Sequence, residues 1–173
     1  MKSSDTRQAV VNQLLNFFWT ILCFAPVIYF WWLAGIHLNF YLFLIISAII
    51  GIIPQKKLDF FLLSHNRKFY EKIGVKYIRK FVQNGDFAAA MSGSRTNHLI
   101  KTTSQAGQYL KTIDMYERYH WICFCFFFLT TIYCFSSGYL KLGFVLVVAN
   151  LLYNISSILL QQYNKIRIRK IIE

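Results

Sequence analysis

Four stretches of almost uninterrupted apolar residues stand out along the chain, at about residues 14–34, 38–53, 119–135 and 142–160. The first is long enough to cross a hydrocarbon core of about 30 Å at 1.5 Å per residue. The second and third lie near the lower length limit for a span. Short connections join the first stretch to the second and the third to the fourth. The pattern predicts an all-α integral membrane bundle of four transmembrane helices, arranged as two hairpins in a single domain.

The central polar region, residues 55–118, separates the two hairpins. From Leu58 to Val82, apolar residues recur mostly in steps of three and four, with basic residues mostly on the other side. This spacing predicts an amphipathic cytoplasmic helix, which either lies in an anionic headgroup layer or packs on the cytoplasmic end of the bundle. Turn residues follow at 84–86, a polar loop runs from Met91, and a further helix leads from Ala106 into the third span.

Composition and charge add an orientation to this picture. The chain is 56% hydrophobic and 15% charged, whereas soluble domains carry about 25% charged residues. The net charge of +12 comes from basic residues in the gaps between apolar stretches, and the two hairpin tips contain Lys141 alone. By the positive-inside rule, we expect a multi-pass protein of the cell membrane with both termini in the cytoplasm. This distribution of charge argues against nucleic-acid binding.

Several chemistries leave no motif in the sequence. There is no Gly-rich phosphate loop, no G-x-S-x-G nucleophile elbow and no H-E-x-x-H zinc pair. None of the histidines is followed at four or five residues by aspartate. The four cysteines lie inside apolar stretches, where they are typical of small buried residues. We therefore expect no cofactor and no metal site.

Two polar clusters mark the ends of the third and fourth stretches. In the first, Glu117 and His120 are three residues apart and share a helix face, so the carboxylate can orient the imidazole as a general base. The second, residues 161–167, offers amides, a phenol and positive charge for an oxyanion, phosphate or sugar hydroxyl. Anchoring at the membrane interface explains the same residue types. Asn154, deeper in the span, faces a cavity or makes an interhelical hydrogen bond.

The two clusters also carry a family resemblance. The chain has Glu117 three residues before His120-Trp121 at the start of a span, then Tyr153-Asn154, an apolar stretch, Gln161-Gln162-Tyr163-Asn164-Lys165 and Arg167. This arrangement resembles the small membrane acyltransferases typified by glycosyl-4,4'-diaponeurosporenoate acyltransferase, over roughly residues 69–167. Gln162 and Lys165 stand where that family has arginine, and Ser156 stands where it has proline.

The resemblance implies transfer of a fatty acyl group from a thioester to a hydroxyl of a lipid-linked or glycolipid acceptor. His120 would be the general base and Glu117 its orienting partner, while acyl-CoA or acyl carrier protein would supply the donor at the basic middle segment. The alternative is a non-catalytic small membrane subunit of a larger transport, secretion or biosynthetic complex, with membrane lipids and that complex as its partners. The implied substrate-binding residues are Trp121, Asn154, Gln162, Tyr163, Asn164 and Arg167.

Overall fold

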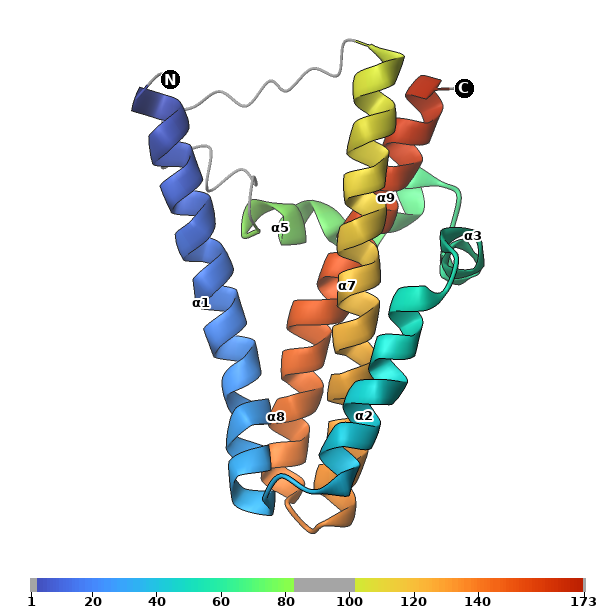
Figure 1. Cartoon of the computed structure of the whole chain (residues 1–173). Coiled ribbons are helices and arrows are strands. Elements are labelled where there is room, and N and C mark those ends of the chain that lie inside the picture. The colour runs from blue at the N-terminus through green and yellow to red at the C-terminus, as the bar shows by residue number, and fades with distance from the viewer. Residues whose placement is uncertain (1–2, 83–101, 173) are drawn as a thin grey trace.

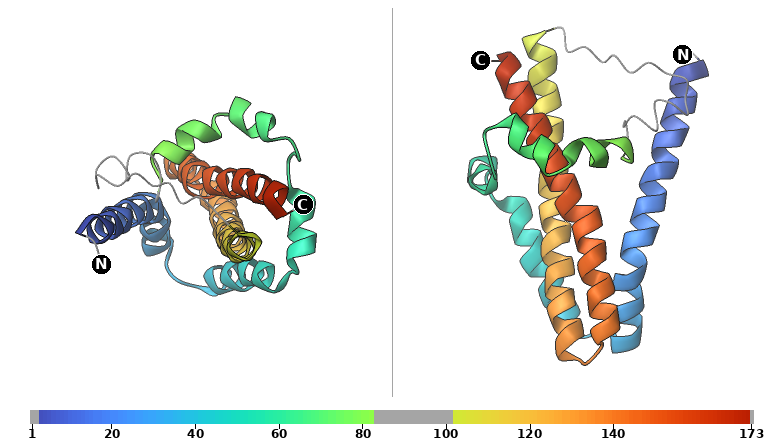
Figure 2. Two further views of the ribbon diagram at one scale, coloured as in Figure 1. Left: turned by 90° about the horizontal axis from the view of Figure 1, so that it is seen from above. Right: turned by 180° about the vertical axis from the view of Figure 1, so that it is seen from behind.

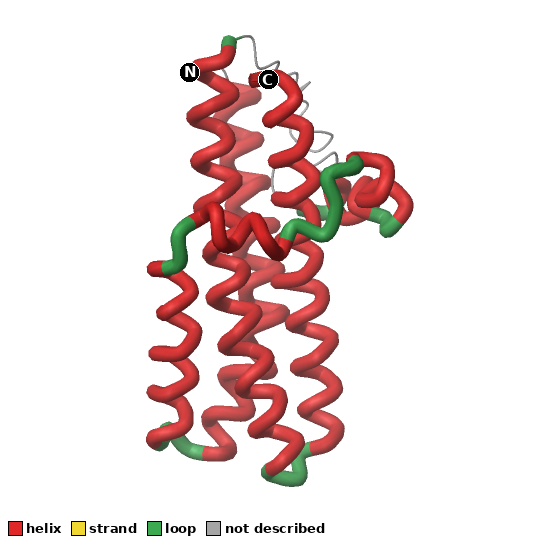
Figure 3. The backbone as a smooth tube through the Cα atoms, turned by 90° about the vertical axis from the view of Figure 1, so that its right-hand side faces the viewer, coloured by secondary structure: helices red, strands yellow, loops and turns green. Residues whose placement is uncertain are grey.

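The computed structural model describes residues 3–82 and 102–172, and every regular element in these two ranges is helical (Figure 3). The expectation of an all-α fold is confirmed for this part of the chain. The turn expected at residues 84–86 and most of the loop expected from Met91 lie outside it. The long elements are α1 (Ser3–Ala34), α2 (Leu38–Ile49), α7 (Thr103–Ser136), α8 (Leu140–Asn150) and α9 (Ser156–Ile172), with the π-helical turn η3 (Leu151–Ile155) between α8 and α9.

Three stretches of the described chain are long and apolar enough to cross a membrane: Thr6–Ala34, Thr103–Ser136 and Leu140–Lys170. A fourth crossing results if Leu38–Ile52 and Gln55–Phe61, bent by 105° at a short break, form one broken span. That break contains Pro54, which has no N–H to continue the helical ladder. The apolar helices indicate a membrane protein, with three crossings or up to four.

The first helix of the second hairpin begins far before its apolar stretch. α7 begins at Thr103, whose neighbour Thr102 caps it by accepting a hydrogen bond from the Gln105 N–H. It then continues unbroken to Ser136, as expected for a helix leading from Ala106 into the span. At its other end Gly138 adopts φ of 85°, and the N–H groups of Gly138 and Tyr139 bond to the carbonyls of Phe135 and Cys134. This Schellman motif stops the helix and turns the chain into α8.

The helices form a bundle that is closed at the hairpin end and open at the end where both termini lie (Figure 1). α7 is central and packs against α2, α8 and α9, whereas α1 packs mainly against α8 and diverges from α7 and α9 toward its N-terminus (Figures 1 and 2). The core near the hairpins is aromatic, and its largest fully buried members are Phe30 and Phe127. Trp31 stacks on Tyr133 there and donates to the Thr130 hydroxyl.

Residues 54–82, hereafter the collar, wrap around α9 when the molecule is viewed from above (Figure 2). The continuous helix expected from Leu58 to Val82 is wrong. α3 (Gln55–Leu58), η2 (Asp59–Phe61), α4 (Arg67–Lys72) and α5 (Val75–Lys80) are separate short helices. Gly74 breaks α4 from α5 because its φ of 88° is left-handed. Tyr70 and Val75 are buried against α9, so the collar packs on the bundle itself.

Candidate functional site

A fully buried lysine lies where α9, α7 and the collar meet. Lys165 has no exposed surface, and its Nζ lies 2.8 Å from Asp59 Oδ1 and 2.9 Å from Asp114 Oδ1. Its third carboxylate partner is Glu117, which is also fully buried. Asp114 and Glu117 are one turn apart on α7, so they present their carboxylates to the same neighbour. The ammonium group therefore ties together three elements that are distant in sequence.

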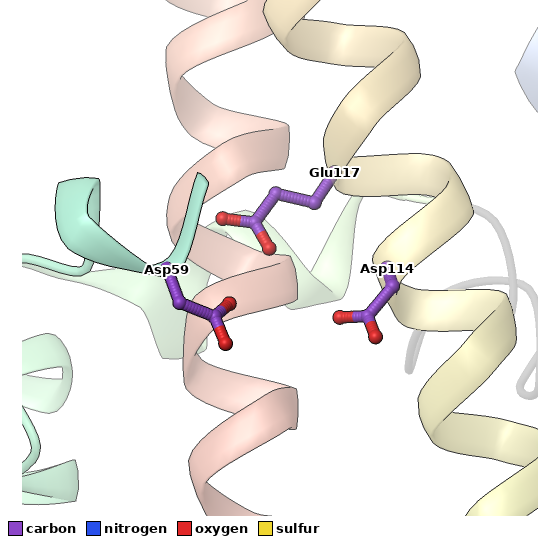
Figure 4. A group of neighbouring side chains, drawn as sticks. All are labelled: Asp59, Asp114 and Glu117. Atoms are coloured by element: carbon purple, nitrogen blue, oxygen red, sulfur yellow. The ribbon is translucent and has the colours of Figure 1, made fainter. Parts of the chain in front are cut away.

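The three carboxylates point toward one another in the manner of a cation site (Figure 4). One oxygen of each lies within 4.8 Å of the others. The Lys165 ammonium, however, contacts all three groups: it donates hydrogen bonds to Asp59 and Glu117 and forms an ion pair with Asp114. Arg169 adds a second cation by donating to the other oxygen of Asp59. The cluster is thus an ion-pair network whose central position is filled by a side chain.

Gln162 links this network to the collar through every polar atom of its amide. Nε2 donates to Glu117 Oε1 at 3.2 Å and to the Phe61 carbonyl at 3.1 Å. Oε1 accepts from the Tyr70 hydroxyl at 3.1 Å and from the Leu63 N–H at 3.4 Å. Burial raises the pKa of the Tyr70 phenol, so it remains a hydrogen-bond donor. Only 1% of Gln162 is exposed, so its visible role is to hold α9 against the collar.

The expected pairing of Glu117 with His120 is wrong in the described structure. Glu117 directs its carboxylate at Lys165 and Gln162 on α9, while the His120 imidazole lies 3.4 Å from Asn154. Three-residue spacing permits the local contact. A desolvated carboxylate is stabilised far more by an ammonium group than by a neutral imidazole. The tertiary partner therefore prevails over the neighbour on the same helix.

A chain of amides determines which nitrogen of His120 carries the proton. The Phe124 carbonyl can only accept, so Asn150 presents Nδ2 to it at 3.2 Å and keeps Oδ1 as an acceptor. Asn154 Nδ2 then donates to that oxygen at 2.8 Å, which leaves Asn154 Oδ1 facing His120 Nδ1. Nδ1 is therefore the protonated nitrogen. Nε2 keeps its lone pair and has the form required of a general base.

The π-helical turn η3 brings further hydroxyl groups beside this imidazole. A π turn holds one residue more than an α turn, and such turns are frequent at functional sites. Tyr153 in η3 packs its ring at 5.3 Å from the His120 ring. Its hydroxyl lies 3.2 Å from Thr20 Oγ1 of α1 and 3.5 Å from the Tyr119 hydroxyl of α7. Hydroxyls from three helical segments thus meet at Tyr153, whose ring packs against His120.

The other expected binding residues are dispersed over the molecule. Trp121 packs on Phe61, and its indole N–H is buried without an acceptor among the described residues. Tyr163 donates to Glu71 of α4 at 3.2 Å, and the Arg167 guanidinium lies 5.5 Å from the Tyr163 ring. Asn164 is half-buried on α9. His120 and Asn154 are brought together, and Gln162 joins Glu117 instead.

Sequence reasoning overlooked the residues that complete both groups. Asp59 and Asp114 belong to the Lys165 network, while Tyr153 packs on His120, Asn150 holds Asn154, and Thr20 contacts Tyr153. The chain contains 7 acidic residues against 19 basic ones. An acidic residue next to an apolar stretch is therefore a usable signal for a buried ion pair. No comparable signal identifies Thr20, because its contact with Tyr153 depends on how α1 packs.

A family model described as glycosyl-4,4'-diaponeurosporenoate acyltransferase matches residues 54–173. The matched range contains the collar, the Lys165 network, His120 and Asn154, and it confirms the relationship suggested by the two polar clusters. α1 and α2 precede it. Neither the curated proteins nor the solved structures gave a match to the chain.

Proposed function

The chain belongs to the glycosyl-4,4'-diaponeurosporenoate acyltransferase family, and from this membership we propose that it moves a fatty acyl group from a thioester donor to a hydroxyl of a lipid-linked or glycolipid acceptor. One observation carries the proposal. His120 of α7 faces η3, where Asn154 engages Nδ1, and Nε2 has no partner among the described residues, so it can accept a proton. Acyl transfer to a hydroxyl needs a general base of this kind.

In the proposed reaction, His120 Nε2 removes the proton of the acceptor hydroxyl as its oxygen attacks the thioester carbonyl carbon. The tetrahedral intermediate collapses, the carbon–sulfur bond breaks, and the thiolate takes the proton back from the imidazolium. The products are an ester and a free thiol, and His120 returns to its neutral form. Asn154 acts as a positioning residue because its carbonyl oxygen stabilises the imidazolium through Nδ1–H.

Tyr153, whose ring packs on His120, and Thr20, which contacts the Tyr153 hydroxyl, are the hydroxyl donors proposed for this reaction. Donors fixed before the reaction stabilise the negative charge that develops on the carbonyl oxygen without needing to reorganise. Glu117 has a different part in this scheme from the one the sequence suggests. It joins α7 to α9 through Lys165 and thereby keeps His120 and Asn154 in register.

The test is comparative lipid mass spectrometry of membranes with the protein, without it, and with His120→Ala. We expect an acylated lipid that disappears in the last two samples, because loss of a general base costs about 10²- to 10⁴-fold in rate. His37→Ala is the matched control. That histidine contacts Tyr133 at the hairpin end of the bundle, far from η3.

Two results would contradict the proposal. One is a lipid profile that does not change when the protein is removed, which favours the accessory-subunit alternative. The other is an acylated lipid that persists in His120→Ala at the wild-type level while depending on the protein. In that case an acyltransferase is present, but its base is another group.

A further inference from the structure

A small cavity of about 130 Å³ lies between the collar and the end of α9, lined by His65, Ile166, Arg169 and Lys170. Three of its four lining side chains are basic. His65 and Lys170 have no hydrogen-bond or ion-pair partner within the described part of the chain, and both are exposed. The cavity lies outside the group around His120, so the proposed chemistry does not account for it.

Arg169 is held in a fixed position at this cavity. Its Nη2 donates to Asp59 Oδ2, and the other Asp59 oxygen is bound by the buried Lys165. The carboxylate is therefore shared between two cations. The other guanidinium N–H groups have no partner in the described ranges, so they can bind an anion. A guanidinium fixed by a buried network loses little conformational entropy on binding.

Size and charge restrict what the cavity can hold. Pockets for whole small-molecule ligands enclose about 300–1,000 Å³, so about 130 Å³ accommodates one end group and not a carrier or an acyl chain. Arg169, Lys170 and His65 line it, and the nearby Asp59 is paired with both Lys165 and Arg169. The matching end group is a small anion with several acceptor oxygens, which is the chemistry of a phosphate.

We propose that this cavity binds a phosphate group of the thioester donor, a carrier with a phosphopantetheine arm. This assignment rests on the proposed acyl transfer. Ile166 lies about 18 Å along the helix from Asn154 at 1.5 Å per residue, a length that an extended phosphopantetheine arm spans. The cavity thus recognises the polar end of the donor at the open end of the bundle, while its thioester reaches the depth of His120.

The experiment uses the full chain in nanodiscs of zwitterionic phosphatidylcholine, titrated with coenzyme A and, separately, with pantetheine. We expect saturable binding of coenzyme A that inorganic phosphate competes away, and at least about tenfold weaker binding of pantetheine, which lacks phosphate. The double variant His65→Gln with Lys170→Gln should weaken coenzyme A binding by about tenfold or more, since neutral amides replace two basic side chains that face the anion.

Lys141→Gln is the matched charge control, because Lys141 is exposed at the hairpin end. The assignment is overturned if the double variant binds coenzyme A as the wild type does, or if pantetheine binds equally well. It is also overturned if phosphatidylglycerol in the nanodisc displaces coenzyme A, since the cavity then takes a lipid headgroup phosphate.

Failure here and failure of the acyl-transfer proposal are distinguishable. His120→Ala should bind coenzyme A with unchanged affinity while losing the acylated product. If coenzyme A binding depends on Lys170 but the lipid profile is the same with and without the protein, the phosphate site is supported and the acyl-transfer proposal is contradicted. If the acylated product is lost in His120→Ala but formed normally by the double variant, the acyl-transfer proposal is supported and the phosphate site is contradicted.

Discussion

The ammonium group of Lys165 has no contact with water. The free-energy cost of burying its charge is therefore offset only by the carboxylates around it. Each of these groups alone would be costly to bury, and the arrangement is favourable only while all are present. The residues occupy η2, α7 and α9, and the collar is held to the bundle by the same charges. A single substitution at this residue therefore affects the whole junction.

Lys165→Met is expected to lower the free energy of unfolding by about 3–5 kcal/mol, because it leaves the fully buried Glu117 carboxylate without its cation. Thermal unfolding of the detergent-solubilised protein measures the effect. Arg167→Met is the matched control, since it removes an exposed basic residue from the same helix. A loss no greater than that of the control would show that the carboxylates find other partners.

Glu71 gives a pH dependence that can be separated from this network. Hydrogen bonds from Arg67 and Lys76 lower the pKa of its carboxyl to about 2. A depressed folded-state pKa contributes stability above the ordinary value of 4.5, and the contribution is lost as the pH falls from there toward 2. We expect Glu71→Gln to unfold at a lower temperature than the wild type at pH 7. The difference should narrow on acidification to pH 2.5, and parallel curves would contradict the assignment.

The sequence predicted which residues form the site better than it predicted which of these residues contact one another. The sequence alone points to His120, Asn154 and Glu117, because polar residues in an apolar span need a reason. Spacing along one helix suggested that Glu117 serves His120. The partner of a buried carboxylate is set by tertiary packing, and Lys165 on α9 supplies a full charge. Local periodicity contains no information about that competition.

Among the secondary-structure elements, η3 has the clearest functional consequence. A π turn absorbs one extra residue while the helices on either side keep their register. Deleting Leu152, which is 50% exposed, should therefore restore an α-helical turn, keep α8 and α9 packed, and displace Tyr153 and Asn154. We expect a folded protein that loses the acylated product, with Leu152→Ala unaffected. If the deletion variant forms the acylated product at the wild-type level, the π-helical turn η3 is not required for the reaction.

The bend between α2 and α3 depends on an arginine from α7. Arg118 Nη1 donates to the carbonyls of Gly51 and Ile53 at 2.7 and 2.6 Å, and Nη2 donates to Gln55. These carbonyls lie at a helix end where Pro54 prevents continuation. Arg118→Met should destabilise the fold by about 2 kcal/mol or more, since hydrogen bonds to charged groups contribute about 1.5–3 kcal/mol each.

Thermal unfolding measures the effect of Arg118→Met. The control is Lys111→Met, an exposed change on the same helix. Equal stability of the two variants would contradict the capping role. The same arginine explains part of what the sequence did not predict. It reads as an interface anchor by composition, whereas its contacts are specific to backbone carbonyls that only the folded hairpin brings near.

The apolar cores of the long helices and the extension of α7 before its span were predictable, but the extension of α9 beyond its span was not. α7 and α9 continue well beyond their apolar stretches. The polar residues in those extensions pair with each other across the two helices, as Glu117 does with Lys165. A hydropathy profile treats such charged residues as the end of a span, because it contains no information about the partner helix that neutralises them.

At the scale of the whole molecule, the termini lie at one end and the two hairpin turns at the other (Figure 1). Together with the positive-inside rule, this arrangement predicts which end faces the cytoplasm. In a cysteine-free background, Ser137→Cys should react with an impermeant thiol reagent added outside intact cells. Gln108→Cys should react only after the cells are opened. Both residues are exposed, and the opposite labelling pattern would reverse the orientation.

The bend after α2 also has a consequence for the surrounding bilayer. Leu38–Ile52 rises only about 22 Å at 1.5 Å per residue, against a hydrocarbon thickness of about 30 Å. Arg118 fixes the end of this segment, so it cannot lengthen to match. A short hydrophobic segment is accommodated by local thinning of the bilayer. We therefore expect the lipid headgroups beside α2 to be drawn inward, which would bring the acceptor hydroxyl of the proposed reaction closer to the buried polar groups of α7.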